Sequence, residues 1–157
     1  MRQLITGVDA EGRSCVVAEH RVDPRSGDQT RRMVNFATET NPAPARPPGG
    51  GEARDLGVPV GTTRLMLLQW PPGVSHGMHH TDTIDFDTVL EGSVTLLLDD
   101  GPHLLEAGDV AVITGVDHAW ESGPDGATIS FVFLGTPSPD EGEGEVRREE
   151  GTDARGR

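Results

Sequence analysis

The sequence predicts an all-β protein, and three observations support this prediction. Its 157 residues include 21 glycines and 12 prolines, a content that suits many turns between short strands. From residue 62 onward, short runs rich in Val, Leu, Ile, Thr and Phe alternate with turn signals. These signals recur about every 8 to 12 residues, a spacing typical of an antiparallel sandwich or barrel. They lie at 71–73, 91–92, 99–102, 108–109 and 124–126.

The N-terminal part predicts a separate set of elements. Apolar runs at 3–7 and 13–19 flank Gly12 and predict a β-hairpin, and 32–39 is a third candidate strand. Residues 40–57 are rich in proline and contain three consecutive glycines, so we expect an irregular covering loop without a helix or central strand. We therefore expect residues 1–61 to pack on a barrel formed by residues 62–135.

The C-terminal stretch, residues 136–157, differs from the rest in composition. It is rich in acidic residues and arginine and contains a single valine. Such a segment buries too little apolar surface to offset the entropy cost of ordering. We expect it to be a disordered acidic tail.

Charge and composition exclude several classes of function. The formal net charge is −13, so the surface repels nucleic acid and anionic membranes as partners. The chain has no lysine for a Schiff base and no tyrosine for phenolic chemistry. It has one cysteine, and no apolar run long enough for a signal peptide or a membrane span. The expected location is the cytoplasm, and the expected partner is a small-molecule substrate.

Two sets of residues have a distinctive spacing. The first set begins at a glycine and reaches a second glycine through a histidine, a threonine and an aspartate; the second set runs from a glycine to a serine through a histidine. The residues are Gly73, His79, Thr81, Asp85 and Gly92, followed by Gly108, Thr114, Gly115, His118 and Ser122. In this spacing, the segment 73–122 resembles the cupin superfamily, in particular its small single-domain proteins with one conserved barrel. The resemblance implies a double-stranded β-helix, the cupin jelly-roll barrel, with an N-terminal β-hairpin or arm.

The resemblance also implies a metal site. Cupins use three histidines and one glutamate as ligands, but here Thr81 replaces the second histidine and Asp85 replaces the glutamate. The implied ligands are thus His79, Asp85 and His118. Two imidazoles and one carboxylate are a recognised set for a divalent metal ion, here Fe, Zn, Mn or Ni.

Alternation along a strand decides which of the two adjacent histidines faces this site. If His79 faces the barrel interior, His80 points away from it. A competing register uses His80 and His76 instead. In the first register, which we favour, His76 lies near the mouth of the barrel and reaches the site from there.

The same alternation places Thr81 and Asp87 on the inner face with Asp85. Thr81 is expected to hydrogen-bond a substrate oxygen or a metal-bound water. Asp87 has two interpretations: a general acid or base with a raised pKa, or a structural acceptor for a loop amide. His76 is the other candidate for moving a proton.

The distribution of cations bears on the ligand. No arginine or lysine occurs between Arg64 and Arg147. An anionic ligand usually requires an arginine fork, so the sequence favours a neutral or a metal-chelating small molecule. Among the available arginines, Arg64 is expected to be the best placed to offer a counter-charge.

Three functions follow as hypotheses. The first is a metal-dependent tailoring enzyme of bacterial specialised metabolism, which dehydrates, cyclises, decarboxylates or isomerises its substrate, or oxygenates it if the metal is iron. The second is a metal-free acid–base enzyme, and the third is a non-catalytic cupin that binds a small ligand. The resemblance further implies a homodimer, formed through an edge strand or the N-terminal arm.

Overall fold

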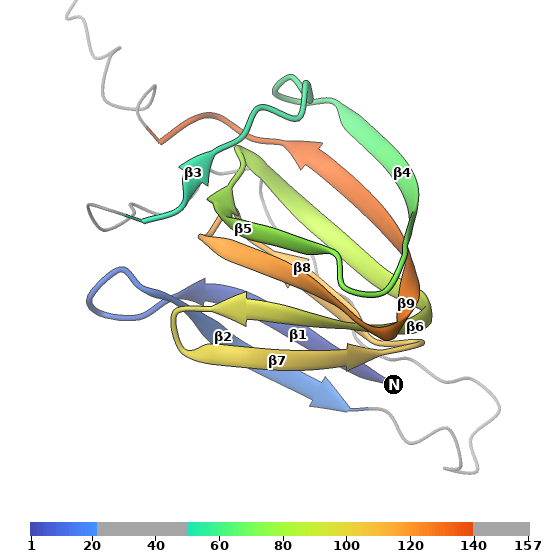
Figure 1. Cartoon of the computed structure of the whole chain (residues 1–157). Coiled ribbons are helices and arrows are strands. Elements are labelled where there is room, and N and C mark those ends of the chain that lie inside the picture. Colours follow the sequence, from blue (N-terminus) through green and yellow to red (C-terminus); the bar gives the residue numbers. More distant parts are fainter. Residues whose placement is uncertain (22–49, 140–157) are drawn as a thin grey trace, which may run out of the picture.

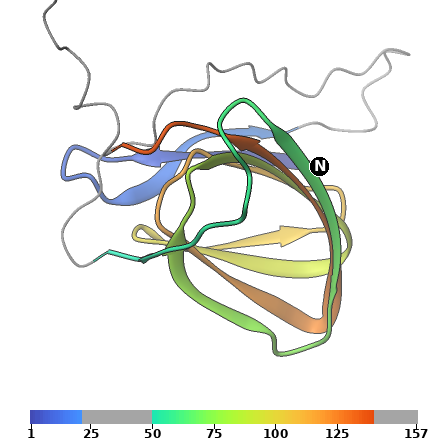
Figure 2. The ribbon, with the colours of Figure 1, turned by 90° about the horizontal axis from the view of Figure 1, so that it is seen from above.

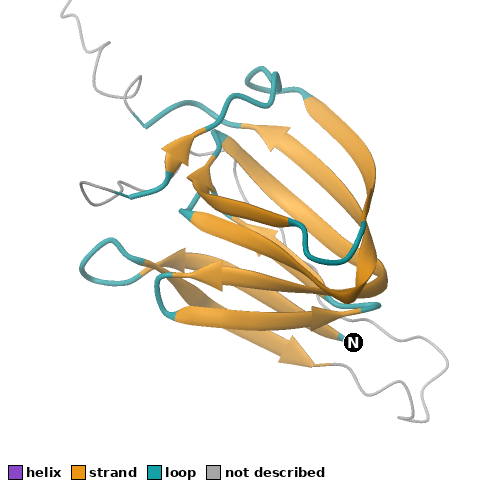
Figure 3. Ribbon diagram, in the orientation of Figure 1, coloured by secondary structure: helices purple, strands orange, loops and turns teal. Residues whose placement is uncertain are grey.

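The computed structural model describes residues 1–21 and 50–139 (Figure 1). This part consists of strands, turns and loops and contains no helix (Figure 3). A membrane-spanning helix is accordingly not found in the described residues. The candidate strand at 32–39 and all but the first four residues of the expected tail, 136–157, lie outside the described part.

Nine strands follow one another along the described chain. They are β1 (Arg2–Val8), β2 (Ser14–Arg21), β3 (Glu52–Ala53), β4 (Thr63–Trp70), β5 (Ser75–His80), β6 (Thr83–Leu98), β7 (Gly101–Glu106), β8 (Val110–Ile113) and β9 (His118–Gly135).

These strands form one strongly curled sheet. Its main path runs β2-β1-β8-β6-β9-β5-β3, while β4 pairs with β9 and β7 pairs with β6. Seen from above, the strands curl around a common interior (Figure 2). The long strands β6 and β9 pair with each other over most of their length and connect the two ends of the barrel.

The N-terminal hairpin is present as the sequence predicts. β1 and β2 pair antiparallel, and Gly12 in the turn has a φ of 78°. β1 also pairs in parallel with β8, and the Thr6 hydroxyl donates to the carbonyl oxygen of Val112 at 3.1 Å. The hairpin therefore extends the barrel sheet itself.

Two of the expected turns are bends inside continuous strands. Gly92 lies within β6 and Gly126 within β9, with φ of 70° and 78°. A Cβ on Gly92 would lie 2.1 Å from the carbonyl oxygen of Gly126. The backbones of β6 and β9 therefore approach each other so closely here that only glycine fits. Register shifts flank Gly92, and such bulges bend a strand without reversing it.

The bulges also exchange the two faces of β6. Inward-facing residues have odd numbers before the bend and even numbers after it. The first half thus points two acidic side chains and one valine into the barrel, Asp85, Asp87 and Val89, and the second half points only apolar ones, Val94, Leu96 and Leu98.

The apolar core is continuous with the wall of the site. Leu96, Ile113 and Ile129 are fully buried, and each such side chain contributes about 1.5–3 kcal/mol relative to an exposed one. Trp120 and Phe131 belong to the same cluster and also line the cavity described next. The site is therefore built on rigid packing.

Candidate functional site

A cavity of about 170 Å³ opens inside the barrel. Its wall combines aromatic and aliphatic side chains with three histidines, one carboxyl group and one guanidinium. The lining residues are Arg54, Leu56, Met66, Leu68, Trp70, His76, His79, Thr81, Asp85, His118, Trp120, Phe131 and Phe133. All three predicted metal ligands and two of the three predicted catalytic residues thus share one cavity, while Asp87 does not line it.

The centre of the site is the pair His79 and His118. The two residues are directly opposed in the β5–β9 ladder, and their ring centroids are 4.4 Å apart. Both are buried, with 8% and 2% of their surface exposed. The pairing of the two strands thus brings together histidines that are 39 positions apart in the sequence.

Both rings are held in the same tautomer. The Nδ1–H of His79 donates to the carbonyl oxygen of Gly77 at 2.8 Å, and that of His118 donates to Val116 at 2.9 Å. Since a carbonyl only accepts, each Nε2 keeps a free lone pair. Burial lowers the pKa of His79, and burial and His79 lower the pKa of His118 to about 3. Both imidazoles are therefore neutral bases at physiological pH.

His80 faces the other side of β5. Its Nδ1–H donates to the carboxylate of Asp117 at 2.7 Å, and it lines a different pocket. A register shift between His76 and His79 brings His76 to the same cavity as His79, and its ring lies 4.9 Å from that of Trp70. The structure thus has the arrangement of the favoured register, with His76 at the wall.

Asp85 lines the cavity from β6. Burial raises its pKa to about 7, opposed by a hydrogen bond that the Thr83 hydroxyl donates to it. The Thr83 hydroxyl also bonds with that of Thr81 at 2.7 Å. Thr83 was not predicted to take part, although the two-residue period of the strand places it on the same face as Asp85.

Asp87 lies behind Asp85, with 3% of its surface exposed. Neither of its oxygens has a hydrogen-bond partner in the described part of the chain. The loop-amide bond that the sequence left open is thus absent there. Burial and the neighbouring Asp85 raise the pKa of Asp87 well above its usual value.

The donors fit a divalent metal in part. Two neutral imidazoles, each with Nδ1 bonded to a backbone carbonyl and Nε2 free, have the arrangement of metal-ligating histidines. Asp85 supplies a carboxyl to the same cavity but is bonded to Thr83. Within residues 1–21 and 50–139, no three His, Cys, Asp or Glu side chains surround a common point as metal ligands. His79 and His118 are therefore the fitting ligands, and Asp85 must reorient to complete the set.

The cation at the cavity is Arg54, where the sequence favoured Arg64. Arg64 is exposed, and its guanidinium donates to the carbonyl oxygen of Leu56 at 2.7 Å. Arg54 follows β3, whose two residues pair in parallel with His79 and His80. No pattern in the glycine- and proline-rich stretch indicates this pairing, so Arg54 could not be found from the sequence.

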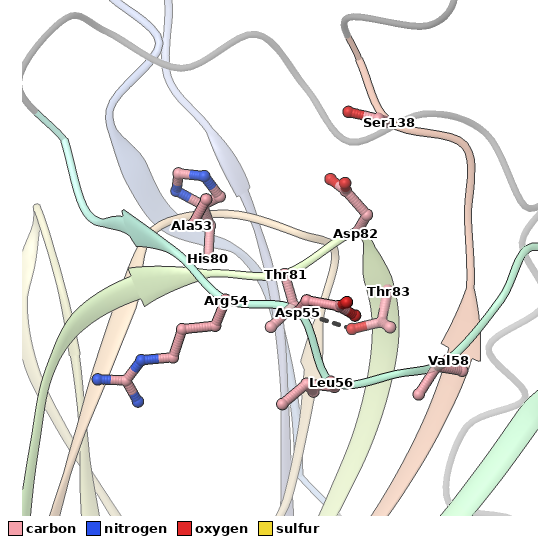
Figure 4. Close-up of a pocket in the computed structure, with 10 residues that line it drawn as sticks. All are labelled: Ala53, Arg54, Asp55, Leu56, Val58, His80, Thr81, Asp82, Thr83 and Ser138. Carbon is pink, nitrogen blue, oxygen red and sulfur yellow. Dashed lines mark hydrogen bonds between the residues drawn. The ribbon is translucent and has the colours of Figure 1, made fainter.

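A second pocket, of about 320 Å³, adjoins the segment that carries Arg54 (Figure 4). It shares Arg54, Leu56 and Thr81 with the first cavity. Its remaining lining residues are mostly polar: Ala53, Asp55, Val58, His80, Asp82, Thr83 and Ser138.

Sequence comparisons find relatives from fungi. "Phomopsin biosynthesis cluster protein C'" of Diaporthe leptostromiformis is 31% identical over 123 residues, which cover 69% of this chain and 61% of the relative. "Cupin-domain-containing oxidoreductase fogC" of Aspergillus ruber is 30% identical over 125 residues, which cover 74% and 61%. The chain thus spans 61% of the length of these curated relatives. No family model matches the sequence.

Comparison with solved structures finds partial matches to two bacterial proteins. A sugar phosphate isomerase from a cupin superfamily, from Silicibacter pomeroyi, has 27% identity and a TM-score of 0.42, over 48% of this chain and 52% of that one. A Cupin 2 conserved barrel domain protein from Salinispora arenicola has 22% identity and a TM-score of 0.42, over 46% and 62%.

Three observations agree on the fold of this chain. The sheet curls into a barrel, residues of the two spaced motifs line its interior, and one relative is named for a cupin domain. The sequence led us to expect a bacterial source, whereas the two curated relatives described above are fungal. This chain has the cupin fold.

Proposed function

We propose that the protein is a metal-dependent enzyme that performs a tailoring step on a small, largely apolar molecule. The observation that supports this proposal most is the pair His79 and His118, with both Nε2 atoms unprotonated and both Nδ1 atoms bonded to carbonyls. Such fixed neutral imidazoles suit a divalent ion of Fe, Zn, Mn or Ni. Asp85 is the third ligand of the proposal.

A bound divalent ion supplies a Lewis acid that polarises an oxygen of the substrate. Around it, the aromatic wall of Trp70, Trp120 and Phe131 excludes water from the apolar body of the ligand. Thr81 lines the cavity, and since its hydroxyl proton is donated to Thr83, its oxygen is available to accept a hydrogen bond from a substrate hydroxyl or a metal-bound water. His76 is the proposed proton carrier because its ring borders the cavity. Asp87 has no surface there and takes part only through Asp85.

The relatives support the tailoring role. One bears the name of a biosynthesis cluster protein and another that of an oxidoreductase. Dehydration, cyclisation, decarboxylation, isomerisation and, with iron, oxygenation are the reactions we propose for this site. A cavity of about 170 Å³ is smaller than the roughly 300–1,000 Å³ typical of drug-sized ligands. The substrate, or the part of it that enters, is therefore small.

Elemental analysis of protein purified without a polyhistidine tag tests the metal. We expect about one first-row metal ion per chain in the wild type and its loss in His79→Ala and His118→Ala. His103→Ala is the control, because His103 lies in the β7 hairpin and bonds to Asp100. A wild-type protein that binds none of the four metals after loading contradicts the metal-dependent proposal.

A metal-free acid–base enzyme is the second candidate. It is favoured by the absence of a preformed three-ligand group in the described residues and by the raised pKa of Asp85, which makes this group a proton donor near pH 7. Retention of activity in protein stripped of metal separates the two candidates. An activity lost in stripped protein and restored by one of the metals supports the first.

We also propose that the protein forms a homodimer and acts in the cytoplasm. Among the described strands, β4 pairs only with β9, and its outer face exposes Leu65 and Leu67 to 64% and 65%. An open edge with exposed leucines is suited to a second copy of the chain. Sedimentation analysis should give a dimer for the wild type and a monomer for Leu67→Asp; a monomeric wild type contradicts the dimer.

A further inference from the structure

Arg54 is the one arginine, among the residues that the structure describes, that lines either of these two pockets. Its position is fixed by the backbone. Its N–H donates to the carbonyl oxygen of His80 at 2.9 Å, directly after the parallel pairing of β3 with β5. The guanidinium is therefore held beside the strand that carries His79.

Within the described part of the chain, the Arg54 side chain has no hydrogen bond or ion pair. Two acids lie near it in sequence or space, Asp55 and Asp82, but the guanidinium extends away from both (Figure 4). The side chain is half-buried. A guanidinium has only N–H donors, so when it is partly desolvated and has no anion beside it, some of these donors lack an acceptor.

The charge of Arg54 acts on the cavity with the two histidines. It contributes to the lowered pKa of both His79 and His118, which places it within electrostatic reach of both rings. The imidazoles are neutral, and the opposite walls are apolar. Arg54 is thus the source of positive potential at this cavity.

We propose that Arg54 binds a carboxylate of the substrate, so that the substrate class is a small, mostly apolar carboxylic acid. The planar fork of a guanidinium matches the two oxygens of a carboxylate. A phosphate dianion fits less well, since a single guanidinium would face it in a cavity that also contains Asp85. This inference rests on the proposed function, because it takes the cavity of His79 and His118 as the substrate site. It replaces the neutral ligand that the sequence favoured.

Tryptophan fluorescence offers a direct test, because both tryptophans of the chain, Trp70 and Trp120, line the cavity. The probes are benzoate and phenylacetate, each compared with its neutral amide, titrated into the full chain stripped of metal. We expect both acids to bind wild type more tightly than their amides. In Arg54→Gln, acid affinity should fall by about tenfold or more, and amide affinity should not change. Arg54→Lys should recover only part of the loss.

Arg21→Gln is the matched control, because it removes the same charge from an exposed site on β2. It should leave all four affinities unchanged. Equal affinity for acids and amides, no binding of either acid, or an unchanged acid affinity in Arg54→Gln overturns the inference.

The same titrations in metal-loaded protein separate this inference from the proposed function. An effect of Arg54→Gln in a protein that binds no metal supports the carboxylate site while the metal-dependent function fails. Acid binding that requires the metal and ignores Arg54 overturns the carboxylate site and leaves the metal-dependent function standing.

Discussion

The Nδ1–H of His80 donates to the Asp117 carboxylate at 2.7 Å, on the face of β5 opposite to His79. The Asp117 side chain is 4% exposed, so this bond satisfies a carboxylate that water does not reach. The bond ties His80 to the loop before β9 and leaves His79 as the histidine that faces His118.

His80→Ala should therefore reduce stability without affecting the site. Loss of the partner of a buried acceptor costs about 1–3 kcal/mol. His103→Ala is the control, since its bond to Asp100 has the same length but lies on an exposed hairpin. Urea denaturation should show a larger loss for His80→Ala than for His103→Ala. Equal losses, or a metal content that falls with His80→Ala, would contradict this account of β5.

Gly51 sets the distance between β3 and β5. A Cβ at this position would lie 2.7 Å from the backbone nitrogen of His79 and 2.9 Å from the Asp117 carboxylate. Gly51→Ala should thus push the segment that carries Arg54 away from β5, at a cost of about 1–3 kcal/mol for overpacking.

Gly77→Ala is the matched control for Gly51→Ala, because a Cβ at Gly77 meets nothing within 4 Å. Benzoate titration followed by tryptophan fluorescence should show weaker binding for Gly51→Ala and little change for Gly77→Ala. If the two variants bind benzoate alike, the packing of β3 on β5 does not position Arg54.

Asp87 should make stability depend on pH. Its pKa, like that of Asp85, is raised by burial, so the folded protein keeps protons that the unfolded chain releases above about pH 4. The contribution of these two carboxyl groups to the stability of the metal-free protein should therefore fall as pH rises from about 4, and for Asp85 the fall should end near its pKa of about 7. His79 and His118, whose pKa values are lowered, contribute in the opposite direction up to about pH 6.5, so the two carboxyl groups are best followed by substitution.

Asp87→Asn should remove one part of this loss. Each unit by which the pKa of Asp87 is raised costs about 1.4 kcal/mol at high pH. The variant should equal wild type near pH 4 and exceed it in stability at pH 8, measured by urea denaturation. Asp125→Asn, at an exposed position, should track wild type at both pH values. Lower stability of Asp87→Asn at pH 8 would show that the buried carboxyl has a partner that stabilises it.

The alternation of side chains along a strand predicted which residues face the interior of the barrel. It places Asp85, Asp87 and Val89 on one face, and the structure has all three buried. The same count reaches back to Thr83, which was overlooked although it follows the same rule. The chemical roles of these residues stay predictions.

Two features of the structure could not be predicted from the sequence. A glycine with positive φ serves equally in a chain reversal and in a bulge, so Gly92 and Gly126 read as turns although they bend continuous strands. Arg54 owes its place to a two-residue parallel pairing, and such long-range contacts leave no periodic pattern in a glycine-rich segment.

In the proposed site, one metal ion binds the Nε2 atoms of His79 and His118 together. Nitrogen-15 NMR of histidine-labelled, tag-free protein, titrated with Zn²⁺, tests this shared coordination. We predict that both rings show the Nδ1–H tautomer without metal and that both Nε2 signals shift in parallel, reaching completion at one equivalent. Shifts confined to other histidines, or none at either ring, would contradict the claim.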